Sequence, residues 1–207
     1  MKKIFFALCL LALMTVGANA SVVLLDTFNP PGSNEASATS WALTGTNYSV
    51  PEELAVKFVA ASAVTIDSIL AAIQGTGDVT LGIMSDTGGS PGKPSDTFLY
   101  SVLLTDPTEN VSLPSLGWSL SAGTYWLAAV PAEADFNGYW QSDGITSDWA
   151  YNKYNQFGWY DVATQYPGGL GQSPAVRINA VPEPSTMLLL GSGLAGLIGY
   201  GRRRLKK

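Results

Sequence analysis

The sequence lacks most of the side chains that enzymes use for nucleophilic and metal-assisted catalysis. It contains no histidine, and its single cysteine, Cys9, lies inside an apolar run near the N-terminus. The rest of the chain therefore has neither the usual general base nor a thiolate nucleophile. Ser142 and Ser147 have no histidine to activate them. We expect no catalytic residue, no cofactor and no metal. Because a glycoside hydrolase needs only two carboxylates, about 5–10 Å apart, a carboxylate-based glycoside hydrolase stays open as an alternative.

Acidic side chains recur in the turns of the central region. Calcium takes six to eight oxygen ligands, and such turns can supply them. No Asp-x-Asp-x-Asp spacing occurs, however, so solvated turn aspartates are the favoured interpretation. The residues concerned are Asp86, Asp96, Asp106, Asp135, Asp143 and Asp148.

Aromatic residues are concentrated between positions 136 and 166. Exposed aromatic rings can stack on sugars while neighbouring polar groups bind the hydroxyls, so this stretch predicts polysaccharide binding. The candidate stacking residues are Tyr139, Trp140, Trp149, Trp159 and Tyr160. The candidate polar partners are Asp143, Asn152, Asn155, Gln156 and Asp161. The alternative is that alternate aromatics, such as Trp149, Tyr151 and those on the Trp159 side of its strand, fill the core between the sheets.

The C-terminus changes character abruptly after Ala180. Val181-Pro182-Glu183-Pro184-Ser185 predicts an extended junction, because the residue before a proline avoids the helical region. An uncharged apolar segment follows, and Arg202, Arg203 and Arg204 come directly after it. We expect a single transmembrane helix at about 186–201, roughly 25 Å long at ~1.5 Å per residue. The basic end at 202–207 would keep the C-terminus cytoplasmic and leave the preceding domain outside.

The order of proline motif, short glycine-rich helix and arginine cluster resembles the PEP-CTERM sorting signal. The resemblance covers residues 181–207 and implies that an exosortase, a membrane-embedded cysteine protease-transpeptidase, is the partner of this chain. By that resemblance Pro182, Glu183 and Pro184 form the substrate motif, and the processed protein passes to the cell surface or extracellular matrix. A plain tail-anchored membrane ectodomain is the alternative.

The N-terminus has the features of a secretory signal peptide over residues 1–20. Lys2 and Lys3 precede an apolar run, and Ala18-Asn19-Ala20 forms a small-x-small cleavage site that would leave Ser21 as the first residue. The apolar run is shorter than the roughly 20 residues that a membrane span prefers, so cleavage is favoured over an uncleaved helix.

The region between these signals, residues 21–180, is acidic. It carries four Lys and Arg residues against fifteen Asp and Glu residues, a net charge of about −11. Such a surface repels phosphate groups, and we therefore expect no nucleic-acid partner.

Hydrophobic alternation predicts that residues 21–180 form an all-β ectodomain, an antiparallel β-sandwich or a jelly-roll-like fold. Apolar residues alternate within the candidate strands, as in Tyr125, Leu127 and Ala129, and Gly, Pro, Asn, Asp and Ser separate the strands. Residues 66–74 tolerate a helix, although β-branched residues favour a strand there. The strand at 77–83, the turn at 86–92 and the segment 120–128 together resemble parts of the sandwich ectodomains that precede PEP-CTERM anchors. The candidate strands are 22–28, 54–58, 64–69, 79–83, 97–104, 112–120, 124–130, 139–141, 148–154, 158–162 and 175–180.

Overall fold

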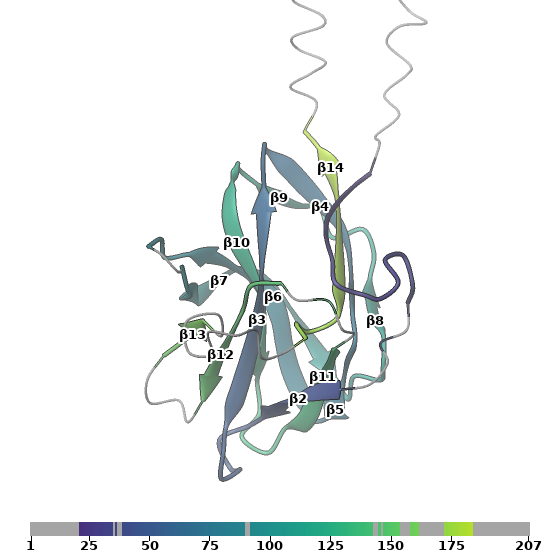
Figure 1. The fold of residues 1–207 in the computed structure, drawn as a ribbon. Helices are drawn as coiled ribbons and strands as arrows, with labels where there is room; N and C mark the ends of the chain where they lie inside the picture. The colour runs from purple at the N-terminus through teal and green to yellow at the C-terminus, as the bar shows by residue number, and fades with distance from the viewer. Residues whose placement is uncertain are drawn as a thin grey trace, which may run out of the picture.

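The computed structural model describes residues 21–34, 36, 39–89, 92–142, 145, 147–153, 158–161 and 172–183 (Figure 1). The predicted signal segment 1–20, the predicted membrane helix at about 186–201 and the basic cluster Arg202–Arg204 lie outside these residues. Among the described residues, no helix is long and apolar enough to cross a membrane. Every regular element of this part is a strand, and every strand pairing is antiparallel, so the predicted all-β class is confirmed.

The strands form two sheets, and the larger sheet curls into a half-barrel (Figure 1). The smaller sheet has the order β1-β14-β4-β8, and β9 also pairs with β4. Its strands are β1 (Val22–Asp26), β14 (Val176–Pro182), β4 (Val64–Ala71), β8 (Val111–Leu113) and β9 (Trp118–Leu120).

The larger sheet has the order β5-β11-β2-β3-β10-β6-β7, with β12 paired to β3 and β13 paired to β12. Its strands are β5 (Ile73–Thr76), β11 (Asn137–Ser142), β2 (Thr39–Thr44), β3 (Glu52–Ala60), β10 (Gly123–Pro131), β6 (Asp78–Asp86), β7 (Pro94–Thr105), β12 (Trp149–Lys153) and β13 (Tyr160–Asp161).

One expected strand is divided in the structure, one expected strand segment is confirmed, and one strand was not expected. The predicted strand at 112–120 is divided into β8 and β9, because Pro114 interrupts the ladder and Ser115 and Gly117 have positive φ angles of 56° and 66°. The segment 66–74, for which a helix was the alternative, forms strands β4 and β5. Strand β2 was not expected at all, because Thr39–Thr44 holds only three apolar residues and no long alternating run.

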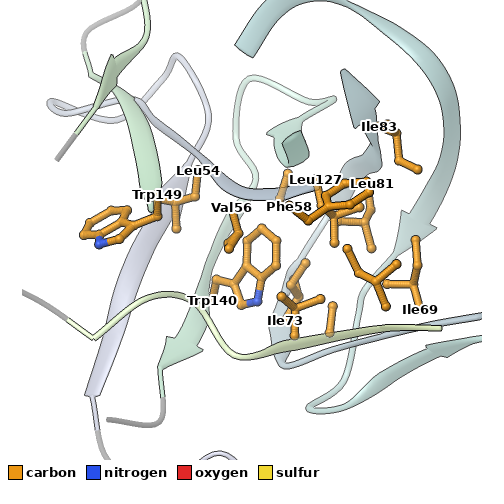
Figure 2. Close-up of a cluster of buried hydrophobic side chains, with 14 of the residues drawn as sticks. Leu54, Val56, Phe58, Ile69, Ile73, Leu81, Ile83, Leu127, Trp140 and Trp149 are labelled. Carbon is orange, nitrogen blue, oxygen red and sulfur yellow. The ribbon is translucent and has the colours of Figure 1, made fainter. Parts of the chain in front are cut away.

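The main core lies between the two sheets (Figure 2). Alternate residues of β3, Leu54, Val56 and Phe58, are buried there, and the same face of β10 contributes Leu127 and Ala129. This is the period of two expected for a strand with one face in the core, and it confirms the predicted packing of the β10 face.

The opposite face of the larger sheet carries a second apolar cluster. Its buried members are Ala55, Met84, Trp126, Ala128, Ala150 and Trp159. The indole Nε1–H of Trp126 donates to Asp86 Oδ1 at 2.7 Å, so the ring is buried without an unsatisfied donor. The outer face of this sheet is therefore partly covered, and it is not a simple solvated surface.

The first and last strands of the domain lie side by side, and the start of β1 and the end of β14 are at one end of the molecule (Figure 1). Near the other end of these strands, Arg177 Nε donates to Asp26 Oδ2 at 2.9 Å, and Arg177 Nη1 donates to Asn34 Oδ1 at 3.0 Å. Both side chains of the Arg177–Asp26 pair are only 14% exposed. Charge-assisted hydrogen bonds of this kind are stronger than neutral ones, so the pair helps to hold β14 against β1.

Candidate functional site

The first two residues of the Pro-Glu-Pro motif lie on the folded domain. Strand β14 runs as far as Pro182, which pairs with Val64, and the backbone N–H of Glu183 donates to the carbonyl of Ala63 at 3.2 Å. Strand β1 pairs with β14 only as far as Ala180, so Pro182 needs no N–H donor on that side. The sheet therefore continues two residues beyond the predicted domain boundary at Ala180. Pro184, the third residue of the motif, lies outside the described residues.

The predicted stacking aromatics divide into buried and accessible groups. Trp140, Trp149 and Trp159 are 0%, 4% and 4% exposed, respectively. A sugar cannot reach these rings in this conformation, so the stacking role is not retained for the three tryptophans. The neighbour of Trp140 on β11, Tyr139, faces outward and is 40% exposed. Tyr160 is partly buried and stacks on Tyr151 at a centroid distance of 6.0 Å.

A pocket of about 280 Å³ lies at the end of the larger sheet where β3 begins. Residues 44–46, Pro51 and Glu53 form one part of its wall, and residues 131–134 and Asn152 form the other. These segments belong to the β2–β3 hairpin, the end of β10 and strand β12. The pocket thus collects side chains from three parts of the sequence that only the sheet topology brings together.

The rim of the pocket is fixed by backbone contacts. The N–H of Gly45 donates to the carbonyl of Phe136 at 2.9 Å, and the N–H of Asn47 donates to the carbonyl of Ala134 at 2.7 Å. A Cβ atom at position 45 would collide with the carbonyl oxygens of Glu133 and Ala134. Glycine is therefore required for the close approach of the β2–β3 hairpin to the loop that follows β10.

Glu53 and Asn152 form a hydrogen-bonded pair in the pocket wall. Asn152 Nδ2 donates to Glu53 Oε2 at 2.9 Å, and Asn152 is only 7% exposed. Asn152 Oδ1 is buried and makes no hydrogen bond within the described part of the chain. Burial raises the pKa of Glu53 above its ordinary value of 4.5; the hydrogen bond from Asn152 opposes this rise, and the negative charge of Asp96 adds to it.

The raised pKa of Glu53 predicts how stability depends on pH. A carboxyl group whose pKa rises on folding binds its proton more tightly in the folded state, so the free energy of unfolding falls as pH rises from about 4.5 toward the folded-state pKa. We expect Glu53→Gln to remove this fall, because glutamine keeps an acceptor for Asn152 and carries no charge. Denaturant unfolding of both proteins between pH 4 and pH 8 measures the difference.

The exposed residue Glu109 offers a control for the loss of one negative charge. The stability difference between Glu53→Gln and the natural sequence should grow across the pH window, and that for Glu109→Gln should not grow in the same way. If the curves for Glu53→Gln and the natural sequence ran parallel, the raised pKa would be wrong.

The sequence located only part of this pocket. Asn152 was expected to bind hydroxyl groups, and the structure places it in the pocket wall. Asp143, Asn155 and Gln156 lie outside the described residues, and the side chain of Asp161 is likewise not described. Glu53 and Glu133 were not singled out. The alternation of Leu54 and Val56 into the core places Glu53 on the opposite face, but it does not reveal that this face is covered.

The turn aspartates have structural partners. Asp86 Oδ2 accepts from the N–H of Gly88 at 2.9 Å, and Asp106 Oδ1 accepts from the N–H of Gly77 at 2.8 Å. Within the described ranges, no group of three or more Asp, Glu, His or Cys residues is placed to hold a metal ion. Asp86 therefore closes a local turn, as is common for aspartate, whereas Asp106 joins the segment after β7 to the connection between β5 and β6.

One family matches the sequence by comparison with known proteins. The PEP-CTERM protein-sorting motif matches residues 180–204 at the C-terminus. A search of curated proteins found no match. The resemblance drawn from the proline motif, apolar segment and arginines is thus confirmed over nearly the same residues. The match supports an exported protein that is sorted by way of an exosortase.

Proposed function

We propose that this chain is a noncatalytic protein of the cell surface or extracellular matrix that reaches its place through its C-terminal tail and binds polysaccharide. The observation that carries the sorting part is the match of residues 180–204 to the PEP-CTERM protein-sorting motif. In this proposal the N-terminal signal is cleaved before Ser21, and the helix at about 186–201, with the cluster Arg202–Arg204, holds the chain in the membrane. The exosortase then acts at Pro182-Glu183-Pro184.

The position of the motif on the domain supports this order of events. β1 begins one residue after the proposed signal cleavage site, and β14 ends inside the sorting motif, so both processing sites lie at the same end of the smaller sheet. The two processing enzymes, both in the membrane, would then reach their sites while the rest of the domain extends outward.

Polysaccharide binding is the proposed task of the displayed domain. Tyr139 is the candidate stacking residue with the clearest exposure, and its ring is available at the outer side of β11. The acidic domain carries few cations for an anionic polymer, so a neutral polysaccharide suits it better.

A carboxylate-based glycoside hydrolase is the second candidate function. One observation favours it: Glu53 and Glu133 line the same pocket, and the pKa of Glu53 is raised, as a general acid requires. The Glu133 carboxylate already accepts a hydrogen bond from the backbone N–H of Asp78 at 3.3 Å. Release of new reducing ends from a neutral polysaccharide would favour the hydrolase, and retention without release would favour the binding protein.

Removing the tail tests the sorting proposal. A chain that ends after Glu183 keeps all of β14 and loses the third motif residue, the proposed membrane helix and the arginines. We expect this chain to appear in the culture medium, with the full chain remaining in the membrane and surface fractions of cells that contain an exosortase. Immunoblots of the fractions measure the distribution. Equal retention of both chains at the surface would contradict a role for the tail.

A further inference from the structure

We propose that the pocket beside Glu53 and Asn152 binds a single uncharged sugar unit, the end of a polysaccharide chain, through its hydroxyl groups. This inference rests on the proposed function, since it gives the polysaccharide a defined place on the domain. It differs from the sequence-based expectation, which placed the sugar on exposed aromatic rings.

The size of the pocket indicates one sugar unit. Its volume of about 280 Å³ is slightly below the ~300 Å³ at which pockets for drug-sized ligands begin. Pro51 and Pro131 contribute apolar wall, and Thr44, Thr46 and Asn152 contribute polar groups. An apolar wall with a few convergent polar groups is typical of small-ligand sites.

The unsatisfied hydrogen-bonding groups of Asn152 indicate that the ligand carries a hydroxyl group. When Glu53 is ionised, Asn152 Nδ2 donates to it at 2.9 Å, and the buried Oδ1 is left without a partner among the described residues. When Glu53 is protonated, a flipped amide can accept from Glu53, and the Nδ2 donors are then left over. A buried polar group without a partner is costly in either state. A hydroxyl both donates and accepts, so it satisfies Asn152 in both states.

The charges of the wall indicate an uncharged sugar. Glu53 and Glu133 line the pocket, and no lysine or arginine is among the lining residues. An anionic sugar such as a uronate would meet repulsion in this environment. A cationic amine is a poorer partner than a hydroxyl, because an ammonium group only donates and cannot accept from the Nδ2 donors of Asn152 that are left over when Glu53 is protonated.

The pocket lies at the end of the domain opposite the sorting motif. Strand β3 begins at the pocket with Glu52 and ends at Ala60, close to the turn into β4, where Val64 pairs with Pro182. In Figure 1 the start of β3 and the end of β14 are at opposite ends of the molecule. A domain held in the membrane by its tail would therefore present the pocket outward.

Titration calorimetry with simple sugars tests the inference. The full chain is purified in a zwitterionic detergent without a sugar headgroup and is titrated with methyl glycosides of glucose, galactose and mannose. Glucuronate and glucosamine serve as anionic and cationic probes. We expect at least one neutral glycoside to bind and the two charged sugars to bind about ten-fold or more weakly.

Two variants alter the pocket in different ways. Asn152→Leu removes the buried amide, and Thr46→Trp fills the mouth from an exposed position, where it should not disturb folding. Each is expected to weaken binding of the neutral glycoside about ten-fold or more. Asn137→Ala, at an exposed position on β11 outside the pocket, is the matched control and should bind as the natural sequence does. Thermal unfolding of each variant separates a lost site from a lost fold.

The possible outcomes distinguish the pocket from the proposed function. If binding survives both pocket variants and is lost in Tyr139→Ala, the pocket inference is overturned and polysaccharide binding stands. If the natural sequence binds neither the sugars nor the polysaccharide of its own cell, both the pocket inference and the proposed polysaccharide binding fail. Tighter binding of glucuronate or glucosamine than of the neutral glycosides would overturn the assignment of an uncharged ligand.

Discussion

Replacing Trp140 with alanine is expected to lower the free energy of unfolding by about 3–5 kcal/mol, a large part of the stability of an ordinary domain. The Trp140 ring is fully buried in the main core (Figure 2), and its Nε1–H donates to the carbonyl of Ala175 at 2.9 Å. The substitution leaves a cavity and removes the partner of a buried carbonyl oxygen. Urea unfolding followed by fluorescence and circular dichroism measures the effect.

The adjacent residue gives a control within the same strand. Tyr139 faces outward, so we expect Tyr139→Ala to change the free energy of unfolding by less than about 1 kcal/mol. Equal destabilisation by the two substitutions would contradict the register of β11. A stable Trp140→Ala that loses glycan binding would return Trp140 to the role of a stacking residue.

Replacing Pro182, Glu183 and Pro184 with alanine is expected to leave the tail uncleaved and to retain nearly all of the chain in the membrane. The exosortase would lose its recognition motif, whereas the apolar segment and the arginines that hold the chain would remain. The fold should tolerate the change, because Pro182 is the last residue of β14 and Glu183 follows that strand. Fractionation and the mass of the membrane-bound chain measure the result.

Substitutions next to the motif provide the control. Ser185→Ala with Thr186→Ala changes the neighbouring residues and leaves Pro-Glu-Pro intact, so processing should continue. If the motif variant were processed as fully as this control, Pro182-Glu183-Pro184 would not be the sorting signal.

Much of the fold could be predicted because the alternation of apolar residues in a strand is visible within a short stretch of sequence. Alternation in 54–58 and 124–130 identified β3 and β10 and the faces that they bury. Strand β2 was not predicted because short, half-buried strands lack a strong local pattern. The break between β8 and β9 depends on the backbone angles at Ser115 and Gly117. Strand pairings such as β1 with β14 join opposite ends of the sequence, and no local pattern records them.

The candidate sites differ in the same way. The tail was recognised because a sorting signal is read as a linear motif, and residues 180–204 match it. The pocket could be located only from the arrangement of the strands, since Glu53 comes from β3, Glu133 from the loop after β10 and Asn152 from β12. Tryptophan type alone did not separate stacking from packing: Trp140 and Trp149 both fill the main core, and Trp159 belongs to the cluster on the outer face.

Intact-mass spectrometry of the chain taken from the cell surface tests the central claim most directly. Sorting through the tail predicts a mature protein that begins at Ser21 and ends near Pro184, inside or just after the Pro-Glu-Pro motif. A surface form that still carries Arg202–Arg204 would contradict the account and would favour a plain tail-anchored membrane ectodomain.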